Sequence, residues 1–339
     1  MKDINIYTDD GYIDFNRIYD VYNPTMLIII GARGIGKTYG ALKYLTENNY
    51  KFALIRRTAA EREFIRNEEF NPLTALYTDG IISEFKIEGG KYSDSYYYTE
   101  KNDSFAVSFS IATASKIRGI DGQSITHFMY DEFIKDNNEK ALKDEAGGFF
   151  QLMETIGRNR ELTGRHPIKS ILCANSNNIF NPICDTLKLT DILIDMRDKG
   201  KEQRYIKQKD ILLIDVKRSP ISEKKKETYL YRLTKGTNFF DMAINNQFYN
   251  DISMMVGTPY PFREYKPFAE IQGVHILKHV SSRLLYVSIK NRGVAKYKYF
   301  RWIDFFKDYN LLIQTVVKRG ALFFETADLA SYFKDFLDN

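Results

Sequence analysis

The sequence predicts an α/β fold in which a domain built on buried strands precedes a smaller β-rich domain. Residues 26–30 are all apolar and lead directly into a glycine-rich loop, a pattern typical of a strand buried inside a parallel sheet. Further strand-like runs, each followed by a polar or helical segment, lie at 51–57, 104–112, 125–132 and 168–175. Near the end of the chain three segments read as a β meander, at 274–280, 283–290 and 294–302.

The composition is that of a folded, water-soluble chain. Its 339 residues are 44% hydrophobic, which is enough for two domains with packed cores. Cys173 and Cys184 are not spaced as C-x-x-C, and with only four histidines they argue against a disulfide framework or a structural zinc. No apolar run approaches the ~20 residues of a membrane span, and the first residues lack the apolar core of a signal peptide. We therefore expect a cytoplasmic protein without a membrane partner.

The net charge of +5 is unevenly distributed along the chain. Residues 1–200 contain 25 Lys and Arg against 29 Asp and Glu, whereas residues 201–339 contain 24 against 15. Such an excess of positive charge is typical of a surface that faces a polyanion such as nucleic acid. A solvated basic surface explains the same excess, and the composition leaves both interpretations open.

Residues 31–38 fit the phosphate-binding pattern G-x-x-x-x-G-K-[ST]. Glycine allows backbone angles that turn successive N–H groups toward a phosphate chain, and the predicted 39–46 helix presents its positive end to the anion. Lys37 adds a charge near the β- and γ-phosphates, and the Thr38 hydroxyl is placed to bind Mg²⁺. We expect the whole loop to bind ATP, namely Gly31, Ala32, Arg33, Gly34, Ile35, Gly36, Lys37 and Thr38.

The strand at 125–132 ends in two carboxylates, Asp131 and Glu132. Asp131 is placed to hold the hydration shell of Mg²⁺, and Glu132 to polarise a water for attack on the γ-phosphate. A strand that simply runs out of apolar residues would leave the same pair, but its position downstream of the phosphate loop favours catalysis. Together the two motifs predict a P-loop NTPase of the additional-strand, catalytic-glutamate type.

Polar side chains also end two other predicted strands. Arg56 and Arg57 lie where the strand meets the ligand crevice of an open sheet. They contact nucleotide, a neighbouring subunit or DNA, or else form a surface ion pair with Glu61 or Glu63. Asn175 either senses the γ-phosphate or orients the attacking water, or simply belongs to an Asn-rich turn.

The predicted helix at 141–159 ends in Gly157-Arg158-Asn159-Arg160. Cations at a helix C-terminus are favourable through the helix dipole alone. The alternative is an arginine finger presented to the ATP of an adjacent subunit. The residues alone leave both interpretations open.

The predicted domain boundaries follow changes in composition. Residues 1–196 form the ATPase domain, 197–235 a charged linker with a basic helix around Lys224-Lys225-Lys226, and 236–339 the basic β-rich domain. No acidic residue lies between Glu270 and Asp304. Strands of this composition cannot hold catalytic metals through carboxylates, but they suit contacts with phosphates or an acidic protein.

These motifs, in this order, resemble those of the genome-packaging ATPases of small protein-primed podoviruses. The resemblance is carried by Gly31–Thr38, Arg56-Arg57, Asp131-Glu132-Phe133, Leu152-Met153-Glu154-Thr155 with Arg158-Asn159-Arg160, Ala174-Asn175 and Asn246-Gln247-Phe248. The run Ala114-Ser115-Lys116-Ile117-Arg118-Gly119 extends it to the wider group of large terminase subunits.

The resemblance implies a homo-oligomeric ring, pentameric in the family, that drives double-stranded DNA through a portal protein into a preformed capsid. It implies ATP and Mg²⁺ as cofactors, with metal bound by Thr38 and Asp131. Catalysis would use Lys37, Glu132 and a trans-acting Arg158. Three further candidates follow: Lys116 and Arg160 as groups facing the neighbouring subunit, and Asn175 as a sensor.

The resemblance also implies a ribonuclease-H-like C-terminal domain that has lost its nuclease site. Terminases that cut DNA need clustered carboxylates for two metals, and here the first β segments offer Ser288 and Lys290 instead. We expect no nuclease activity. In relatives this domain engages the portal and, in some, a structural packaging RNA. The implied location is the host cytoplasm and, transiently, the portal vertex of the capsid.

Two other functions are compatible with the same motifs. A helicase or other nucleic-acid-stimulated ATPase would prefer single strands and separate duplexes. A nucleotide-gated DNA-binding switch would hydrolyse ATP very slowly and without regard to DNA. The adjacent Asp131 and Glu132 favour an active hydrolase over a switch.

Overall fold

The computed structural model describes residues 3–101, 103–117, 122–135, 139–175, 179–216, 219–237, 240 and 255–337. Parts of three motifs lie outside them: Arg118-Gly119, residues 176–178 and residues 246–248. The chain divides into two compact units. Unit 1 comprises Met1–Phe133, Asp144–Ser176 and Met196–Asn246, and unit 2 comprises Ile134–Lys143, Asn177–Asp195 and Gln247–Asn339.

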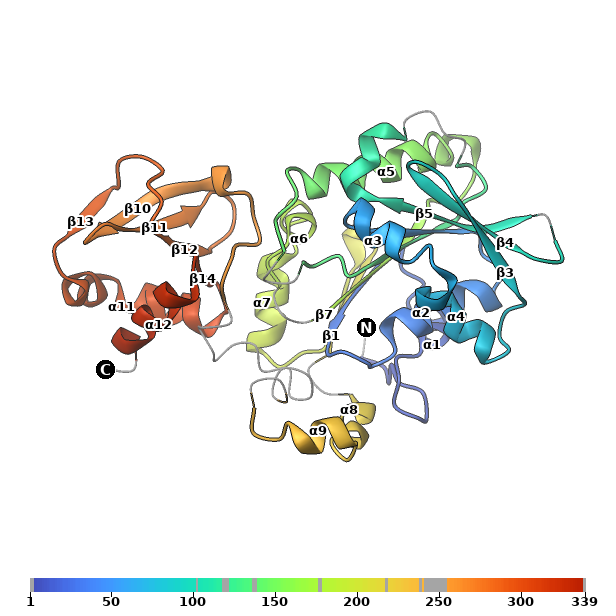
Figure 1. The fold of residues 1–339 in the computed structure, drawn as a ribbon, viewed down its shortest axis with the longest axis horizontal. Coiled ribbons are helices and arrows are strands. Elements are labelled where there is room, and N and C mark those ends of the chain that lie inside the picture. The colour runs from blue at the N-terminus through green and yellow to red at the C-terminus, as the bar shows by residue number, and fades with distance from the viewer. Residues whose placement is uncertain are drawn as a thin grey trace. The chain divides into compact units, whose positions relative to one another are not determined.

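Unit 1 is built on a nine-stranded sheet with the order β3-β4-β5-β2-β6-β7-β1-β9-β8 (Figure 1). From β5 to β9 each strand runs parallel to its neighbours, while β3, β4 and β8 are antiparallel additions at the two edges. The strands are β1 (Met26–Gly31), β2 (Phe52–Arg56), β3 (Phe85–Gly89), β4 (Ser93–Tyr98), β5 (Ser104–Ser110), β6 (His127–Asp131), β7 (Lys169–Asn175), β8 (Gln203–Ile206) and β9 (Ile211–Val216). β3 and β4 pair with each other as an antiparallel hairpin.

Helices cover both faces of this sheet (Figure 1). They are α1 (Phe15–Val21), α2 (Lys37–Glu47), α3 (Ala59–Phe64), α4 (Pro72–Thr78) and α5 (Glu145–Gly157). Every residue of β1, β2 and β6 is buried, as expected for parallel strands packed on both sides. In the part of the chain that the structure describes, no helix combines the length and the apolar composition needed to cross a bilayer.

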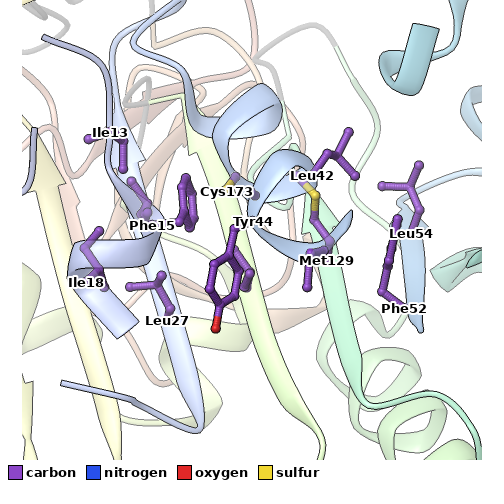
Figure 2. Packing of buried hydrophobic residues seen from close by; sticks show 14 of the residues in the cluster. Ile13, Phe15, Ile18, Leu27, Leu42, Tyr44, Phe52, Leu54, Met129 and Cys173 are labelled. Atoms are coloured by element: carbon purple, nitrogen blue, oxygen red, sulfur yellow. The ribbon is translucent and has the colours of Figure 1, made fainter. Parts of the chain in front are cut away.

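Alternate residues of the central strands point to opposite faces of the sheet and pack in two separate layers of the core. On one face Leu27, Met129 and Cys173 pack with Leu42 and Tyr44 of α2, as Figure 2 shows. On the other face the ring of Tyr130 stacks on Phe149 of α5, with 5.8 Å between ring centroids. The phosphate-loop strand and the Asp-Glu strand are therefore fixed in one rigid layer.

A buried charge cluster ties the edge hairpin to α3. Asp94 of β4 is fully buried and forms ion pairs with Arg62 at 2.9 Å and Arg66 at 2.7 Å. The hydroxyl of Ser108 on β5 donates a third contact to this carboxylate at 2.9 Å. Asp94 thus neutralises the guanidinium of Arg62, a residue that is only 1% exposed.

Replacing Asp94 with Asn should lower the free energy of unfolding by about 3–5 kcal/mol, because it leaves the buried Arg62 charge without a counter-ion. Urea denaturation followed by circular dichroism measures the change. Asp103→Asn, whose side chain is 92% exposed, is the matched control and should leave the midpoint unchanged. An Asp94→Asn protein with the same midpoint as the control would contradict the assigned role of this cluster.

The region predicted as a linker at 197–235 is instead part of unit 1. The run 211–214 is apolar and buried within β9, which pairs in parallel with β1, and β8 closes that edge of the sheet. Two short helices follow, α8 (Pro220–Lys225) and α9 (Tyr229–Leu233). The prediction failed because it relied on the average composition of the region. The charged residues on either side of the short apolar strand dominate that average.

Unit 2 contains a five-stranded sheet with the order β13-β10-β11-β12-β14. Its strands are β10 (Tyr265–Ile271), β11 (Val274–His279), β12 (Leu285–Ser288), β13 (Tyr297–Tyr299) and β14 (Leu322–Phe324). Its helices are α6 (Pro182–Thr186), α11 (Trp302–Lys318) and α12 (Ala327–Leu337), and α7 (Thr190–Asp198) spans the boundary of the units.

The predicted meander at 274–302 is correct for β11 and β12 and wrong for the third segment. β13 pairs in parallel with β10, and the parallel strand β14 takes the open edge of β12. The domain boundary at 235 is also too simple, because residues 134–143 and 177–195 belong to unit 2. Contacts between segments distant in sequence decide both features, so local patterns do not reveal them.

Candidate functional site

The register of the parallel sheet brings the predicted motifs to one edge. Gly31 at the end of β1 lies beside Asn175 at the end of β7, and Asp131 of β6 lies beside Cys173 of β7. One strand, β7, therefore separates the phosphate loop from the Asp-Glu pair. The carboxyl ends of parallel strands are where ligands bind in open α/β sheets.

The loop between β1 and α2 has the backbone needed to wrap an anion. Gly34 and Gly36 have φ values of +70° and +88°, which side chains other than glycine rarely adopt. Here the loop bounds a cavity of about 400 Å³. The cavity is lined by Arg33, Gly34, Gly36, Lys37, Thr38, Tyr39, Asp131, Glu132, Ala174 and Asn175.

The ammonium group of Lys37 is held at the base of this loop. Its Nζ donates to the carbonyl oxygens of Gly31 at 2.9 Å and Ala32 at 2.7 Å, and to Oδ1 of Asn175 at 3.2 Å. Burial lowers the pKa of Lys37 to about 8, and repulsion from Lys225 adds to the effect, while nearby acidic groups oppose it. A buried cation that contacts only neutral oxygens is poised to bind an anion.

Thr38 and Asp131 form an oxygen-rich pair at the same edge. The Thr38 hydroxyl lies 3.0 Å from each carboxylate oxygen of Asp131, and Asp131 is 4% exposed. A hydroxyl and a carboxylate are ligands that Mg²⁺ accepts while keeping several of its waters. This donor set fits the predicted metal site. Described His, Cys, Asp and Glu residues form no larger cluster that could hold a metal.

Glu132 leaves the strand in an unusual conformation. Its φ is +56°, a left-handed value that non-glycine residues adopt uncommonly. Its side chain is 59% exposed, whereas the neighbouring Asp131 is buried. Nη1 of Arg56 lies 3.3 Å from the Glu132 carboxylate and 3.4 Å from that of Asp131.

The two arginines that end β2 have different partners. Arg56 contacts the acidic pair of the site, whereas Arg57 forms a buried ion pair with Glu145 of α5 at 3.0 Å. Glu145 also accepts a hydrogen bond from the Tyr130 hydroxyl at 2.9 Å. The predicted partner Glu61 caps α3 instead, accepting from the backbone N–H groups of Arg57 and Thr58.

The three basic candidates beyond the loop do not line the cavity. Arg158 caps α5 with a φ of +40°, is exposed, and its Nε donates to the Thr155 carbonyl at 3.3 Å. Lys116 is exposed at the end of a short 3-10 helix, Ile111–Lys116. Arg160 is 8% exposed and donates to the Ile125 carbonyl at 2.6 Å, so it also stabilises the fold of its own chain.

One side chain near the loop was not predicted from the sequence. Nζ of Lys225, the last residue of α8, donates to the carbonyl of Arg33 at 2.8 Å. The sequence signalled only a basic run at 224–226, because the parallel pairing of β9 with β1 that brings α8 to this edge is a long-range feature.

Comparisons with known proteins agree with the resemblance inferred from the sequence. The family model for the podovirus DNA encapsidation protein (Gp16) matches residues 10–333. The DNA packaging protein of Bacillus phage B103 is 26% identical over 240 residues, which are 69% of this chain and 68% of that protein. The DNA packaging protein of Bacillus phage phi29 is 26% identical over 242 residues, which are 69% of this chain and 65% of that protein.

A similar fold is known among solved structures. The structure described as the Phi-28 gp11 DNA packaging motor has a TM-score of 0.52 and 16% sequence identity, and the match covers 96% of this chain and 97% of that one. At such low identity the likeness concerns the fold alone. Since the family model spans most of the sequence, this chain belongs to the family of podovirus DNA encapsidation proteins.

Proposed function

We propose that this protein is the ATPase subunit of a motor that drives double-stranded viral DNA through a portal into a preformed capsid. One observation carries the proposal. In this chain of the DNA encapsidation family, the glycine-rich loop with Lys37 and Thr38, the carboxylate of Asp131 and the exposed Glu132 line one cavity. These are the parts that phosphoryl transfer to water requires.

The loop would bind the phosphates of ATP through its backbone N–H groups and Lys37. On binding, Lys37 would exchange its neutral carbonyl partners for a charged phosphate oxygen. Because Lys37 is buried, this charge-assisted hydrogen bond would be a strong one. Thr38 and Asp131 would hold Mg²⁺, which when bound neutralises charge on the phosphates. Asn175 lies 3.2 Å from Lys37 and is suited to report on the phosphates.

Glu132 would act as the general base that orients and activates the attacking water. In this structure its carboxylate contacts Arg56 at 3.3 Å, and an ion pair makes a carboxylate a weaker base. Glu132 would be a stronger base once its carboxylate moves away from Arg56.

Arg158 would supply the trans-acting charge that stabilises the transition state. Its exposure and its absence from the cavity lining of its own chain suit a residue that acts on the next subunit. Such an arrangement requires a homo-oligomeric ring, and we propose a pentamer. Lys116, which is also exposed, is a second candidate at that interface.

Binding of ATP should weaken as the pH rises above about 8. The pKa of Lys37 is about 8, so in the free protein its charge is present below that pH and is lost above it. Bound phosphates stabilise the ammonium form and raise the pKa, so at pH 9 binding must take up a proton, which lowers the affinity about tenfold. Calorimetry of ATP binding in buffers of different ionisation enthalpy would detect this proton uptake. Lys37→Arg, which stays charged at pH 9, should remove most of the uptake.

The second unit would contribute partner contacts rather than chemistry. We propose that it is ribonuclease-H-like and inert as a nuclease, which the pairing of its acidic groups supports. Glu325, next to β14, forms an ion pair with Lys290 and accepts a 2.8 Å hydrogen bond from Ser288. Its basic segment at 271–303 would face the portal, DNA phosphates or a packaging RNA.

Steady-state ATP hydrolysis tests the proposed function. Purified protein should hydrolyse ATP faster with linear double-stranded DNA than with single-stranded DNA, RNA or no polymer, because a packaging motor grips duplex phosphates. Stimulation chiefly by single strands would overturn the proposal in favour of a helicase. Slow turnover that no polymer changes, even with portal-bearing capsids present, would overturn it in favour of a nucleotide-gated switch.

A further inference from the structure

The position of α8 follows from the sheet. β9 runs parallel to β1, and Val216 at its end lies beside Gly31, where the phosphate loop begins. The chain therefore leaves β9 at the same edge as the loop, and α8 starts at Pro220 with Ser219 as its N-cap. Unit 1 thus includes a short helix close to its nucleotide site.

Contacts with the N-terminal segment fix α8 at this place. A Cβ on Gly11 would lie 2.7 Å from Cβ of Pro220, so the two backbones are in close contact. Ile221 is buried in the main core of the unit, and Nζ of Lys224 donates to the Asp10 carbonyl at 3.3 Å. The start of the helix is therefore anchored, which restricts where its last residue can point.

That last residue, Lys225, reaches the phosphate loop itself. Its Nζ donates to the Arg33 carbonyl at 2.8 Å and lies so near Gly34 that a Cβ there would be 2.2 Å away. The two neighbouring lysines are used elsewhere: Lys224 contacts Asp10, and Lys226 pairs with Glu223 at 2.6 Å. Of the three lysines in the basic run, Lys225 alone contacts the loop.

The surroundings of Lys225 lack a counter-ion. Among the described residues it has no carboxylate within ion-pair distance, and its other contact is the ring of Tyr231, 5.4 Å from Nζ to the centroid. Lys225 and Lys37 both contact backbone carbonyls of the 31–38 loop, Lys225 that of Arg33 and Lys37 those of Gly31 and Ala32. Two ammonium groups that converge on one loop of backbone N–H groups repel each other, and a bound polyphosphate would remove that repulsion.

We propose that Lys225 is a phosphate-binding residue of the nucleotide site, which α8 contributes from the same chain. Lys225 contacts the outside of the loop and does not line the cavity in this structure. On ATP binding its ammonium group would leave the Arg33 carbonyl and move to a phosphate oxygen of the polyphosphate chain. The inference rests on the proposed function, since it assumes that the loop binds nucleotide. It adds a cis-acting cation to a site that already has Arg33 and Lys37 in its lining and would receive the proposed Arg158 of the next subunit.

Competition binding with a fluorescent ATP analogue tests this assignment. Lys225→Gln should weaken ATP and inorganic tripolyphosphate by the same factor, about tenfold, which is the loss expected for one charge-assisted hydrogen bond. Lys225→Arg should stay within about threefold of the wild type, because it keeps the charge. Lys226→Gln is the matched control, because Lys226 pairs only with Glu223 of its own helix, and it should bind like the wild type.

Two results would overturn the assignment. Lys225→Gln could bind ATP as tightly as the wild type, or more tightly, which would make Lys225 a group that merely occupies the empty loop. Equal losses in Lys226→Gln and Lys225→Gln would indicate that α8 acts only by packing. Lys37→Ala distinguishes a failure of the Lys225 assignment from a failure of the proposed function. If Lys37→Ala also binds ATP like the wild type, the proposed nucleotide site itself is wrong.

Discussion

Glu132→Gln should reduce ATP turnover by at least about a hundredfold while leaving ATP binding unchanged, because loss of a general base typically costs 10²–10⁴ in rate. Glutamine keeps the shape of the side chain and an oxygen that can accept from Arg56, but it cannot take a proton from water. Its effect should therefore fall on the chemical step. Single-turnover hydrolysis measures the rate of the chemical step, and equilibrium binding measures the affinity for ATP, so together they separate the two effects.

The matched control for this variant is Glu88→Gln, an exposed glutamate on β3 at the edge of the same sheet. It should hydrolyse ATP at the wild-type rate. Wild-type turnover in Glu132→Gln would show that another group activates the water. A large loss of ATP affinity in that variant would instead place the residue in ground-state binding.

Arg158→Ala should lower turnover by about a thousandfold or more, since a trans-acting arginine contributes 10³–10⁵ to phosphoryl transfer. ATP affinity of the isolated subunit should not change, because Arg158 does not line the cavity of its own chain. Arg165→Ala is a suitable control. This exposed arginine lies between Arg158 and the start of β7 in the sequence, and it contacts Gln123. It should remain active.

Mixing two inactive variants tests whether the arginine acts between subunits. In a ring that contains Arg158→Ala and Glu132→Gln subunits, some interfaces combine an intact Glu132 with an intact Arg158 from the neighbour. Hydrolysis should therefore reappear on mixing. If the mixture stays as inactive as its components, while each variant still assembles, Arg158 acts within its own chain or only supports α5.

Local sequence signals were sufficient where the chemistry depends on contiguous residues. The apolar run before Gly31 and the glycines after it predicted both a strand and an anion-binding loop. Asp131 and Glu132 were predicted because a buried strand that ends in carboxylates is recognisable without knowledge of its neighbours. Even so, the left-handed φ of Glu132, which separates the exposed carboxylate from the buried one, has no counterpart in the residue pattern.

Features that depend on pairing between distant segments were missed. Arg56 and Arg57 are adjacent and alike in sequence, yet one lies at the acidic pair and the other in a buried contact with Glu145. Arg158 and Arg160 are close in sequence, yet Arg158 is exposed whereas Arg160 is buried and donates to the Ile125 carbonyl. Likewise, Lys225 gained its position only through the pairing of β9 with β1.

A packaging assay tests the central claim most directly. Linear double-stranded DNA is incubated with this protein, ATP and portal-bearing empty capsids of the same phage, with the packaging RNA if one is required, and DNase is then added. We expect full-length DNA to be protected with the wild-type protein and with Glu88→Gln, and to be digested with Glu132→Gln or without ATP. Digestion of all the DNA despite active, DNA-stimulated ATP hydrolysis by the wild-type protein would contradict the proposed role as the packaging motor.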